Sequence, residues 1–284
     1  MANPYRLLGA YAHPDDEQGV SGLMHKYANA GVDVTLVCAT RGEAGEIAPG
    51  VDATPANLGH VRENELMCAA EKLGITNVYF MNYRDSGMMD TPENADPRCL
   101  WRANVLEVAE QLVRIIRRHK PHVILTFDPN GGYGHPDHIK IHQAATMAYF
   151  MAGDARIFPE QLKDDLVAWA PFKLYWGAFP RSRFARYAEM AEKLGLGINV
   201  PMREFLKRAM PDEIITTRID VAEFVDLKMH ALSCHASQMN PNSIFAKIPP
   251  EIRREGLGTE TLMRVESRVA PTQEIETDLF AGIE

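Results

Sequence analysis

Short apolar runs alternate with longer segments of helical spacing over the first half of the chain. Strands are predicted where the runs are rich in branched and aromatic residues and bounded by Gly, Pro, Asp or Asn, at 5–12, 33–40, 77–83 and 122–129. Between them, apolar residues recur with helical spacing, which predicts helices over 17–30, 60–73 and 100–120. This alternation is typical of a mostly parallel sheet with helices on both faces. The pattern therefore predicts an α/β protein, a Rossmann-like three-layer sandwich.

The pattern is weaker over the last third of the chain. Strands are predicted over 173–180 and 213–221, and helices over 182–195 and 222–236. The tail from Pro241, with the pair Pro249-Pro250 and scattered charges, is expected to be irregular. The chain shows neither an internal repeat nor a clear linker, so we expect one domain, residues 1–284, with a C-terminal extension.

Each of the four strands predicted in the first half is followed by a polar loop. The loops read HPDDE (13–17), RGEAGE (41–46), RDSGM (84–88) and NGGYGHPDH (130–138). In parallel sheets the active groups lie just beyond the carboxyl ends of the strands. Four polar loops at such positions predict a site assembled from several segments.

Composition and charge narrow the classes of function. The 284 residues are 46% apolar and 24% charged, which is ordinary for a globular protein. A formal net charge of −8 argues against a nucleic-acid or anionic-membrane partner, because both are bound through basic patches. The N-terminus lacks the features of a signal peptide, and no apolar run approaches the about 18 residues of a membrane span. We therefore expect a cytoplasmic protein without a membrane span.

The cysteines form no CxxC pair. They are expected to be reduced thiols, mostly buried as small apolar side chains: Cys38, Cys68, Cys99 and Cys234.

The first polar loop places a histidine and three carboxylates directly after a strand. His13 with Asp15 or Asp16 can supply nitrogen and oxygen ligands to a zinc ion at about 2.0–2.2 Å. Consecutive side chains point apart in extended backbone, so the two aspartates are expected to have different roles. Spacing alone does not decide which of them meets the metal. The alternative is an Asp-rich helix N-cap that interacts with the helix dipole.

A second His-Pro-Asp element follows the strand predicted at 122–129. His135 and His138 lie three residues apart, and His142 follows one helical turn later. Read alone, the stretch also suits a glycine-rich turn whose surface histidines enter a helix. Two such elements at strand ends favour a His–Asp–His metal site with an open fourth position, the arrangement of catalytic zinc. The same donor set accepts iron(II), and His142 is expected to pack within its helix.

The two His-Pro-Asp motifs, with VRENEL (61–66) and RDSGM between them, resemble the LmbE-like, or PIG-L, family of zinc-dependent de-N-acetylases. The resemblance spans roughly residues 5–150 and is closest to the deacetylases of the mycothiol and bacillithiol pathways. It implies a hydrolase that removes an acetyl group from an N-acetylglucosamine-type small molecule, and a homo-oligomer. Residues 151–284 match weakly and are expected to shape the substrate pocket.

The resemblance also implies a metal site with an adjacent base. It makes His13, Asp16 and His138 the ligands of Zn²⁺, with Fe²⁺ as the alternative ion. Asp15 becomes the general base that takes a proton from water and passes it to the departing amine.

Five further side chains receive roles from the same resemblance. His135 is the electrophile or acid, held by Asp137, which is expected to keep it charged by raising its pKa. Tyr133 matches a residue that stabilises the oxyanion. Asp85 matches a sugar contact, and Arg62 an arginine that lines the pocket.

Some of these assignments have simpler alternatives. Asp85 suits a turn, and Arg62 suits an ion pair with Glu63 or Glu65 on its own helix. Residues 235–238 (HASQ) receive no chemical role.

Three other functions remain to be compared with a deacetylase. A dinucleotide-binding enzyme is disfavoured because the first turn reads HPDDEQG instead of GxGxxG, and its carboxylates would repel a pyrophosphate. A metal-dependent binding protein without activity has no need of Asp15, Tyr133 and His135. The third is an amidase that cleaves a larger acyl group from a glycoconjugate.

Overall fold

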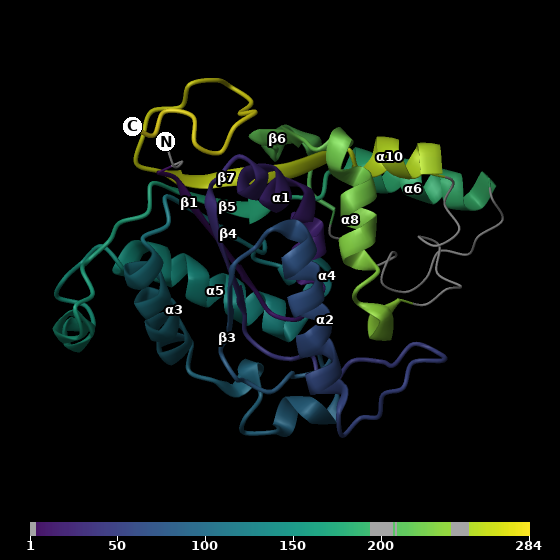
Figure 1. The fold of residues 1–284 in the computed structure, drawn as a ribbon, viewed down its shortest axis with the longest axis horizontal. Helices are drawn as coiled ribbons and strands as arrows, with labels where there is room; N and C mark the ends of the chain where they lie inside the picture. The colour runs from purple at the N-terminus through teal and green to yellow at the C-terminus, as the bar shows by residue number, and fades with distance from the viewer. Residues whose placement is uncertain (1–3, 194–206, 208, 240–249) are drawn as a thin grey trace.

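Seven strands form one sheet in the order β3-β2-β1-β4-β5-β7-β6 (Figure 1). The computed structural model describes residues 4–193, 207, 209–239 and 250–284. The strands are β1 (Arg6–Tyr11), β2 (Asp33–Cys38), β3 (Asn77–Phe80), β4 (Val123–Thr126), β5 (Lys173–Gly177), β6 (Thr217–Asp220) and β7 (Thr259–Ser267). The first five in chain order are parallel, whereas β7 pairs antiparallel with both β5 and β6. The predicted α/β class and mostly parallel sheet are confirmed.

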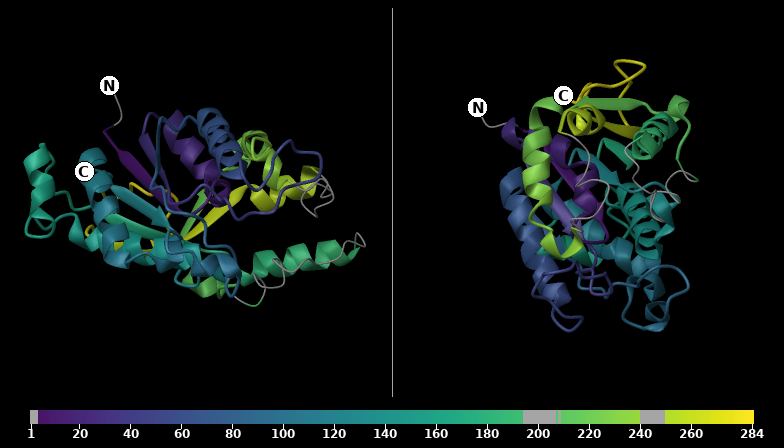
Figure 2. Two further views of the ribbon diagram at one scale, coloured as in Figure 1. Left: turned by 90° about the horizontal axis from the view of Figure 1, so that it is seen from below. Right: turned by 90° about the vertical axis from the view of Figure 1, so that its right-hand side faces the viewer.

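Helices cover both faces of the sheet. They are α1 (Ser21–Asn29), α2 (Leu58–Leu73), α3 (Val105–His119), α4 (Gly131–Gly134), α5 (Pro136–Met151), α6 (Arg181–Lys193), α8 (Val225–Leu232) and α10 (Pro250–Leu257). Two apolar clusters fill the spaces between the layers, one under α1 and α2 and the other under α3 and α5. Figure 2 shows the sheet between these two groups of helices.

Alternation along the central strands explains the two cores. In β1, Leu7 and Tyr11 belong to the cluster under α1 and α2, whereas Leu8 and Ala10 belong to the cluster under α3 and α5. Successive side chains of a strand point to opposite faces, so a strand covered on both sides is apolar at nearly every position. This burial fixes the ends of β1 and β4, from which the two His-Pro-Asp elements start.

The expectation of an irregular tail is wrong for residues 250–267, whereas residues 268–284 form neither helix nor strand. Residues 259–267 form β7, which lies between β5 and β6, and α10 precedes it. The sequence concealed this strand because its second half is only partly buried, so its stability depends on pairing with distant strands. Within the described residues the predicted helix over 182–195 is α6, and positions 194, 195 and 240–249 lie outside them.

The expectation that all cysteines are reduced is also wrong. Cys68 on α2 and Cys234 after α8 form a disulfide, whereas Cys38 and Cys99 are free and buried. The two partners are 166 residues apart, and only the packing of α8 against α2 brings them together.

Among the described residues, every helix is too short or too polar to cross a lipid bilayer.

Candidate active site

The two His-Pro-Asp elements meet where the strand order changes direction. From β1 the chain proceeds through β2 to β3 on one side, and β4 and β5 lie on the other side. Because β1 and β4 are parallel neighbours, the loops after both strands emerge at the same edge. Such a topological switch point is where open α/β sheets bind their ligands.

Three donor atoms converge at this edge. Nδ1 of His13 lies 3.1 Å from Nε2 of His138. A carboxylate oxygen of Asp16 lies 3.5 Å from the former atom and its second oxygen 3.2 Å from the latter. Ligands of a tetrahedral ion bound at about 2.0–2.2 Å lie roughly 3.3–3.6 Å apart. The three observed separations lie within or about 0.2 Å below this range, and the donor types are those that a divalent metal binds.

The backbone and both histidines hold the Asp16 carboxylate in place. Its Oδ2 accepts hydrogen bonds from the backbone N–H of His13 at 2.7 Å and of Ala12 at 3.1 Å. Burial disfavours the charged carboxylate, but His138 and His13 outweigh burial and hold the pKa of Asp16 well below its ordinary value. An ionised Asp16 is the form that a metal requires.

Asp137 supports His13 and not His135, contrary to the expectation from the sequence. Its fully buried carboxylate lies 3.2 Å from Nε2 of His13 and accepts from the backbone N–H of Ser86 at 2.9 Å and from the Ser86 hydroxyl. A carboxylate on the outer nitrogen of a histidine orients that histidine for a metal. Ser86, which the sequence did not single out, in turn orients Asp137.

The surroundings of His135 favour its uncharged form, in the direction opposite to the expected effect of Asp137. Burial and the neighbouring His13 and His138 lower the pKa of His135 to about 2. Its Nδ1 accepts a hydrogen bond from the backbone N–H of Asp137 at 3.2 Å. The proton of the neutral ring therefore resides on Nε2, which makes that atom a hydrogen-bond donor.

Asp15 is set apart from the three donor atoms. Its backbone is left-handed, with φ 102°, and its carboxylate lies 3.4 Å from the guanidinium of Arg62. Burial is the main cause that raises the pKa of Asp15 to about 6, with Asp16 and Glu17 adding to it and Arg62 opposing it. Asp16 therefore lies with the two histidines, whereas the Asp15 carboxylate lies against Arg62.

Arg62 and Asp85 are both engaged within the protein. Arg62 donates to the backbone carbonyls of Pro14 at 2.6 Å and of Gly42 at 2.9 Å, rather than pairing on its own helix. Asp85 accepts from the backbone N–H groups of Ala44 and Gly87 and lies 3.4 Å from Nε2 of His13. Burial opposes the charged form, yet His13 holds the pKa of Asp85 far below its ordinary value.

Tyr133 lies beside the two histidines of the second element. Its ring centroid is 5.2 Å from that of His138 and 6.1 Å from that of His135. Burial raises the pKa of its hydroxyl, so the group stays protonated and can donate a hydrogen bond. Nδ1 of His142 donates a hydrogen bond to the carbonyl of Phe127 at 2.8 Å, and its ring packs against Trp176, in keeping with a structural role.

Alternative ligand sets overlap the one described above. Donor atoms of His13, His135 and His138 lie close enough to share an ion, and so do those of His13, Asp85 and Asp137. The second set uses the nitrogen of His13 that faces Asp137. A metal bound to Nδ1 of His13 would lie with Asp16 and His138, whereas a metal bound to Nε2 of His13 would lie with Asp85 and Asp137.

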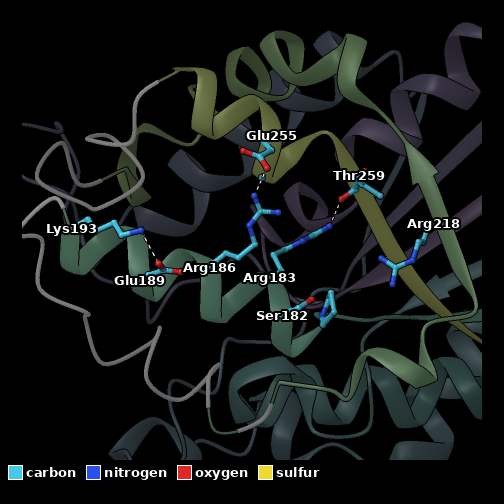
Figure 3. A pocket seen from close by; sticks show the side chains of 10 residues that line it. Ser182, Arg183, Arg186, Glu189, Lys193, Arg218, Glu255 and Thr259 are labelled. Carbon is cyan, nitrogen blue, oxygen red and sulfur yellow. Dashed lines mark hydrogen bonds and ion pairs between the residues drawn. The ribbon is translucent and has the colours of Figure 1, made fainter.

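A cavity of about 580 Å³ lies among the C-terminal elements, lined by parts of α6, α10, β6 and β7 (Figure 3). None of the His and Asp side chains above lines it. Arg186 pairs there with Glu255, and Lys193 with Glu189, while Arg218 adds a further positive charge. The cavity is thus lined by several charged side chains and belongs to the last third of the chain, where the sequence pattern is weakest.

Comparison with known proteins places the chain in a family. Residues 8–149 match the family model described as PIG-L: GlcNAc-PI de-N-acetylase. A 1D-myo-inositol 2-acetamido-2-deoxy-alpha-D-glucopyranoside deacetylase from Acidothermus cellulolyticus is 39% identical, over 98% of this chain and 95% of the relative. The chain belongs to the PIG-L family. A deacetylase of the same description from Geodermatophilus obscurus is 36% identical over 100% of this chain and 99% of the relative, so the similarity to this branch of the PIG-L family spans the whole chain.

Solved structures show the PIG-L fold in proteins with different reactions. An N,N'-diacetylchitobiose deacetylase from Pyrococcus horikoshii superposes with a TM-score of 0.65 at 21% identity, over 92% of this chain and 83% of its own. The 4-carboxy-2-hydroxymuconate hydratase from Pseudomonas putida gives 0.59 at 22% identity, over 95% and 99%. Because the same fold carries a hydratase, the reaction has to be argued from the side chains.

Proposed function

We propose that this chain is a metal-dependent deacetylase of an N-acetylglucosaminyl inositol, the substrate type in the names of its relatives. The observation that supports the proposal most strongly is the convergence of His13, Asp16 and His138 within 3.5 Å, with Asp15 beside them. A binding protein has no need of a separate carboxylate with a raised pKa next to its metal ligands.

In this proposal His13, Asp16 and His138 hold Zn²⁺, and Fe²⁺ is the alternative ion. When bound, the ion acts as a Lewis acid and lowers the pKa of a water molecule from 15.7 toward about 7. Asp137 keeps the ring of His13 oriented for this task. Asp15, with its left-handed backbone and its carboxylate 3.4 Å from Arg62, would remain available to accept a proton.

Asp15 is the general base in this mechanism. It takes a proton from the attacking water and passes it to the amine that leaves, a role worth about 10²–10⁴ in rate. The pKa of about 6 suits the role, because the carboxylate is ionised at neutral pH and still basic enough to accept a proton.

Neutral His135 and Tyr133 serve as donors to the developing oxyanion. The tetrahedral intermediate concentrates negative charge on the former carbonyl oxygen, and preorganised donors stabilise that charge. Burial raises the pKa of the Tyr133 hydroxyl and lowers that of the His135 ring, which supports a protonated hydroxyl and an uncharged ring at neutral pH. His135 therefore acts as an electrophile that donates a hydrogen bond.

Arg62 and Asp85 are proposed to contact the sugar while keeping their hydrogen bonds within the protein. Residues 151–284 are proposed to shape the pocket for the inositol. Cytoplasmic location and a homo-oligomer remain predictions from the sequence.

Acetate release tests the proposal. Protein purified without chelators should contain about one zinc or iron per chain and release acetate from N-acetylglucosaminyl inositol, and chelation followed by zinc should abolish and restore this activity. Release of a longer acyl group in preference to acetyl would favour the amidase. Metal content without turnover on any acylated amino sugar would favour the binding protein.

A further inference from the structure

The peptide bond between Pro14 and Asp15 is held at both ends. Its carbonyl oxygen accepts a hydrogen bond from Nη2 of Arg62 at 2.6 Å, and its N–H donates to Oε2 of Glu17 at 3.0 Å. The torsion φ of Asp15 is the rotation between this peptide and the Cα that carries the carboxylate. Fixing the peptide therefore fixes the direction of the proposed general base.

This fixation has to oppose an intrinsic preference of the backbone. With φ 102° and ψ −18°, Asp15 occupies a left-handed conformation that non-glycine residues seldom adopt. Such conformations persist only where the surroundings over-determine them, and they are found preferentially at active sites. Arg62 and Glu17 supply that over-determination.

Glu17 is itself held by a histidine from the other end of the chain. Its Oε1 lies 2.7 Å from Nε2 of His235, and the two side chains are 1% and 0% exposed. Among the residues that the structure describes, Nδ1 of His235 has no hydrogen-bond partner. The contact with Glu17 is therefore the side-chain hydrogen bond that compensates for the burial of the His235 ring.

The segment that carries His235 is anchored to the helix that carries Arg62. Ser237 donates its N–H and its hydroxyl to the carboxylate of Glu65 at 2.6 and 2.7 Å, and Cys234 is joined to Cys68. Arg62, Glu65 and Cys68 follow each other at three-residue intervals on α2, which places them along one side of the helix. Arg62 and Glu17, which hold the two ends of the Pro14–Asp15 peptide, are thus both anchored to α2: Arg62 directly, and Glu17 through the segment that carries His235.

We propose that His235 is a positioning residue for Asp15, acting through Glu17 on the backbone of the turn. Its hydrogen bond goes to Glu17, which is none of the three proposed metal ligands. This inference rests on the proposed function, because it assigns His235 a part in placing the general base. It gives the HASQ stretch a role that the motif alone did not reveal.

Two amide substitutions that differ by one methylene test the proposal. In His235→Gln the side-chain N–H reaches the position of Nε2 and keeps the bond to Glu17, whereas in His235→Asn it falls short. We expect His235→Asn to lower kcat about 100-fold, the effect of a displacement of about 1 Å in a catalytic group. KM and zinc content should change less than about twofold, and His235→Gln should retain most of the wild-type kcat.

A matched control uses a second buried histidine far from the site. His122 precedes β4 at the opposite edge of the sheet, where its Nδ1 accepts from the backbone N–H of Arg6 at 3.1 Å. His122→Asn should affect stability without a specific loss of kcat. A loss of kcat in His122→Asn equal to that in His235→Asn would show a general packing effect and overturn the proposal.

Crystal structures of the two His235 variants separate this inference from the proposed function. We expect Asp15 to leave the left-handed region in His235→Asn and to keep it in His235→Gln. An unchanged φ or an unchanged kcat in His235→Asn overturns the positioning role, as does a failure of His235→Gln to retain activity. If the wild-type protein releases no acetate, the proposed function fails, and the φ of Asp15 in the variants still decides whether His235 positions this turn.

Discussion

Substituting the neighbouring carboxylates Asp15 and Asp16 by amides should change the stability of the metal-free protein in opposite directions. In the folded protein the pKa of Asp15 rises from 3.8 to about 6, which corresponds to about 3 kcal/mol against its ionised form. Because the carboxylate is 32% exposed, solvent screening reduces this cost to about 1–2 kcal/mol. Asp15→Asn removes the cost, and asparagine tolerates the left-handed backbone.

The sign of the pH dependence follows from the direction of the shift. A folded-state pKa above the unfolded value means that ionisation destabilises the fold, with the full cost present above about pH 6 and none below about pH 4. Asp15→Asn should therefore be about 1–2 kcal/mol more stable than the wild type at pH 7.5, and the gain should shrink toward pH 4. Asp16 has a lowered pKa, so Asp16→Asn should be less stable than the wild type at pH 7.5.

Urea unfolding of the chelator-treated proteins at both pH values measures these differences. In the same series Asp15→Asn should bind zinc and lose about 10²–10⁴ in kcat, whereas Asp16→Asn should lose the metal. A gain in stability for Asp16→Asn, or a loss of metal for Asp15→Asn, would mean that the two roles are reversed.

Three further predictions concern the proposed metal site and the disulfide. Asp137→Asn should weaken zinc binding about 10–100-fold, because the Asp137 carboxylate orients His13. A competition titration against a chelator measures the zinc affinity. A fall in kcat with unchanged zinc affinity would instead indicate that Asp137 supports His135. Burial opposes protonation of His13, but Asp85, Asp137 and Asp16 raise its pKa well above its ordinary value. A metal that binds His13 must therefore displace a proton, and it should bind more weakly as the pH falls. Calorimetry at pH 7 in buffers of different ionisation enthalpy should show this proton release, and its absence would contradict the protonated state. Replacing Cys68 and Cys234 together by serine removes a link between residues 166 apart. The free energy of unfolding should fall by about 2–5 kcal/mol and the Tm by roughly 5–20 °C. A reductant should lower the Tm of the wild type by the same amount and leave the double variant unchanged, and equal Tm values for the untreated proteins would refute the estimate.

Local sequence patterns were sufficient for the parallel half of the fold. β1 to β4 appear where apolar runs are bounded by turn residues, and the polar loops that follow them do meet at one edge. β7 escaped prediction because a strand with a partly exposed half has a weak local pattern and is stabilised by partners far away in the chain. The Cys68–Cys234 disulfide escaped for the same reason, since no local spacing records the packing of α8 on α2.

The candidate site was predictable in its membership and not in its contacts. The resemblance named His13, Asp16 and His138 as ligands, whereas spacing alone left open which of Asp15 and Asp16 lies with the histidines. The resemblance placed Asp137 on His135, whereas the first turn of α5 points its carboxylate toward His13. Glu17 and His235 are separated by more than 200 residues, so only the folded chain reveals their contact.

A crystal structure of the zinc-loaded protein, with anomalous scattering recorded on both sides of the zinc absorption edge, tests the central claim most directly. The account predicts one strong peak about 2.0–2.2 Å from Nδ1 of His13, a carboxylate oxygen of Asp16 and Nε2 of His138. A peak on Nε2 of His13 between Asp85 and Asp137, or the absence of any peak near His13, would contradict it.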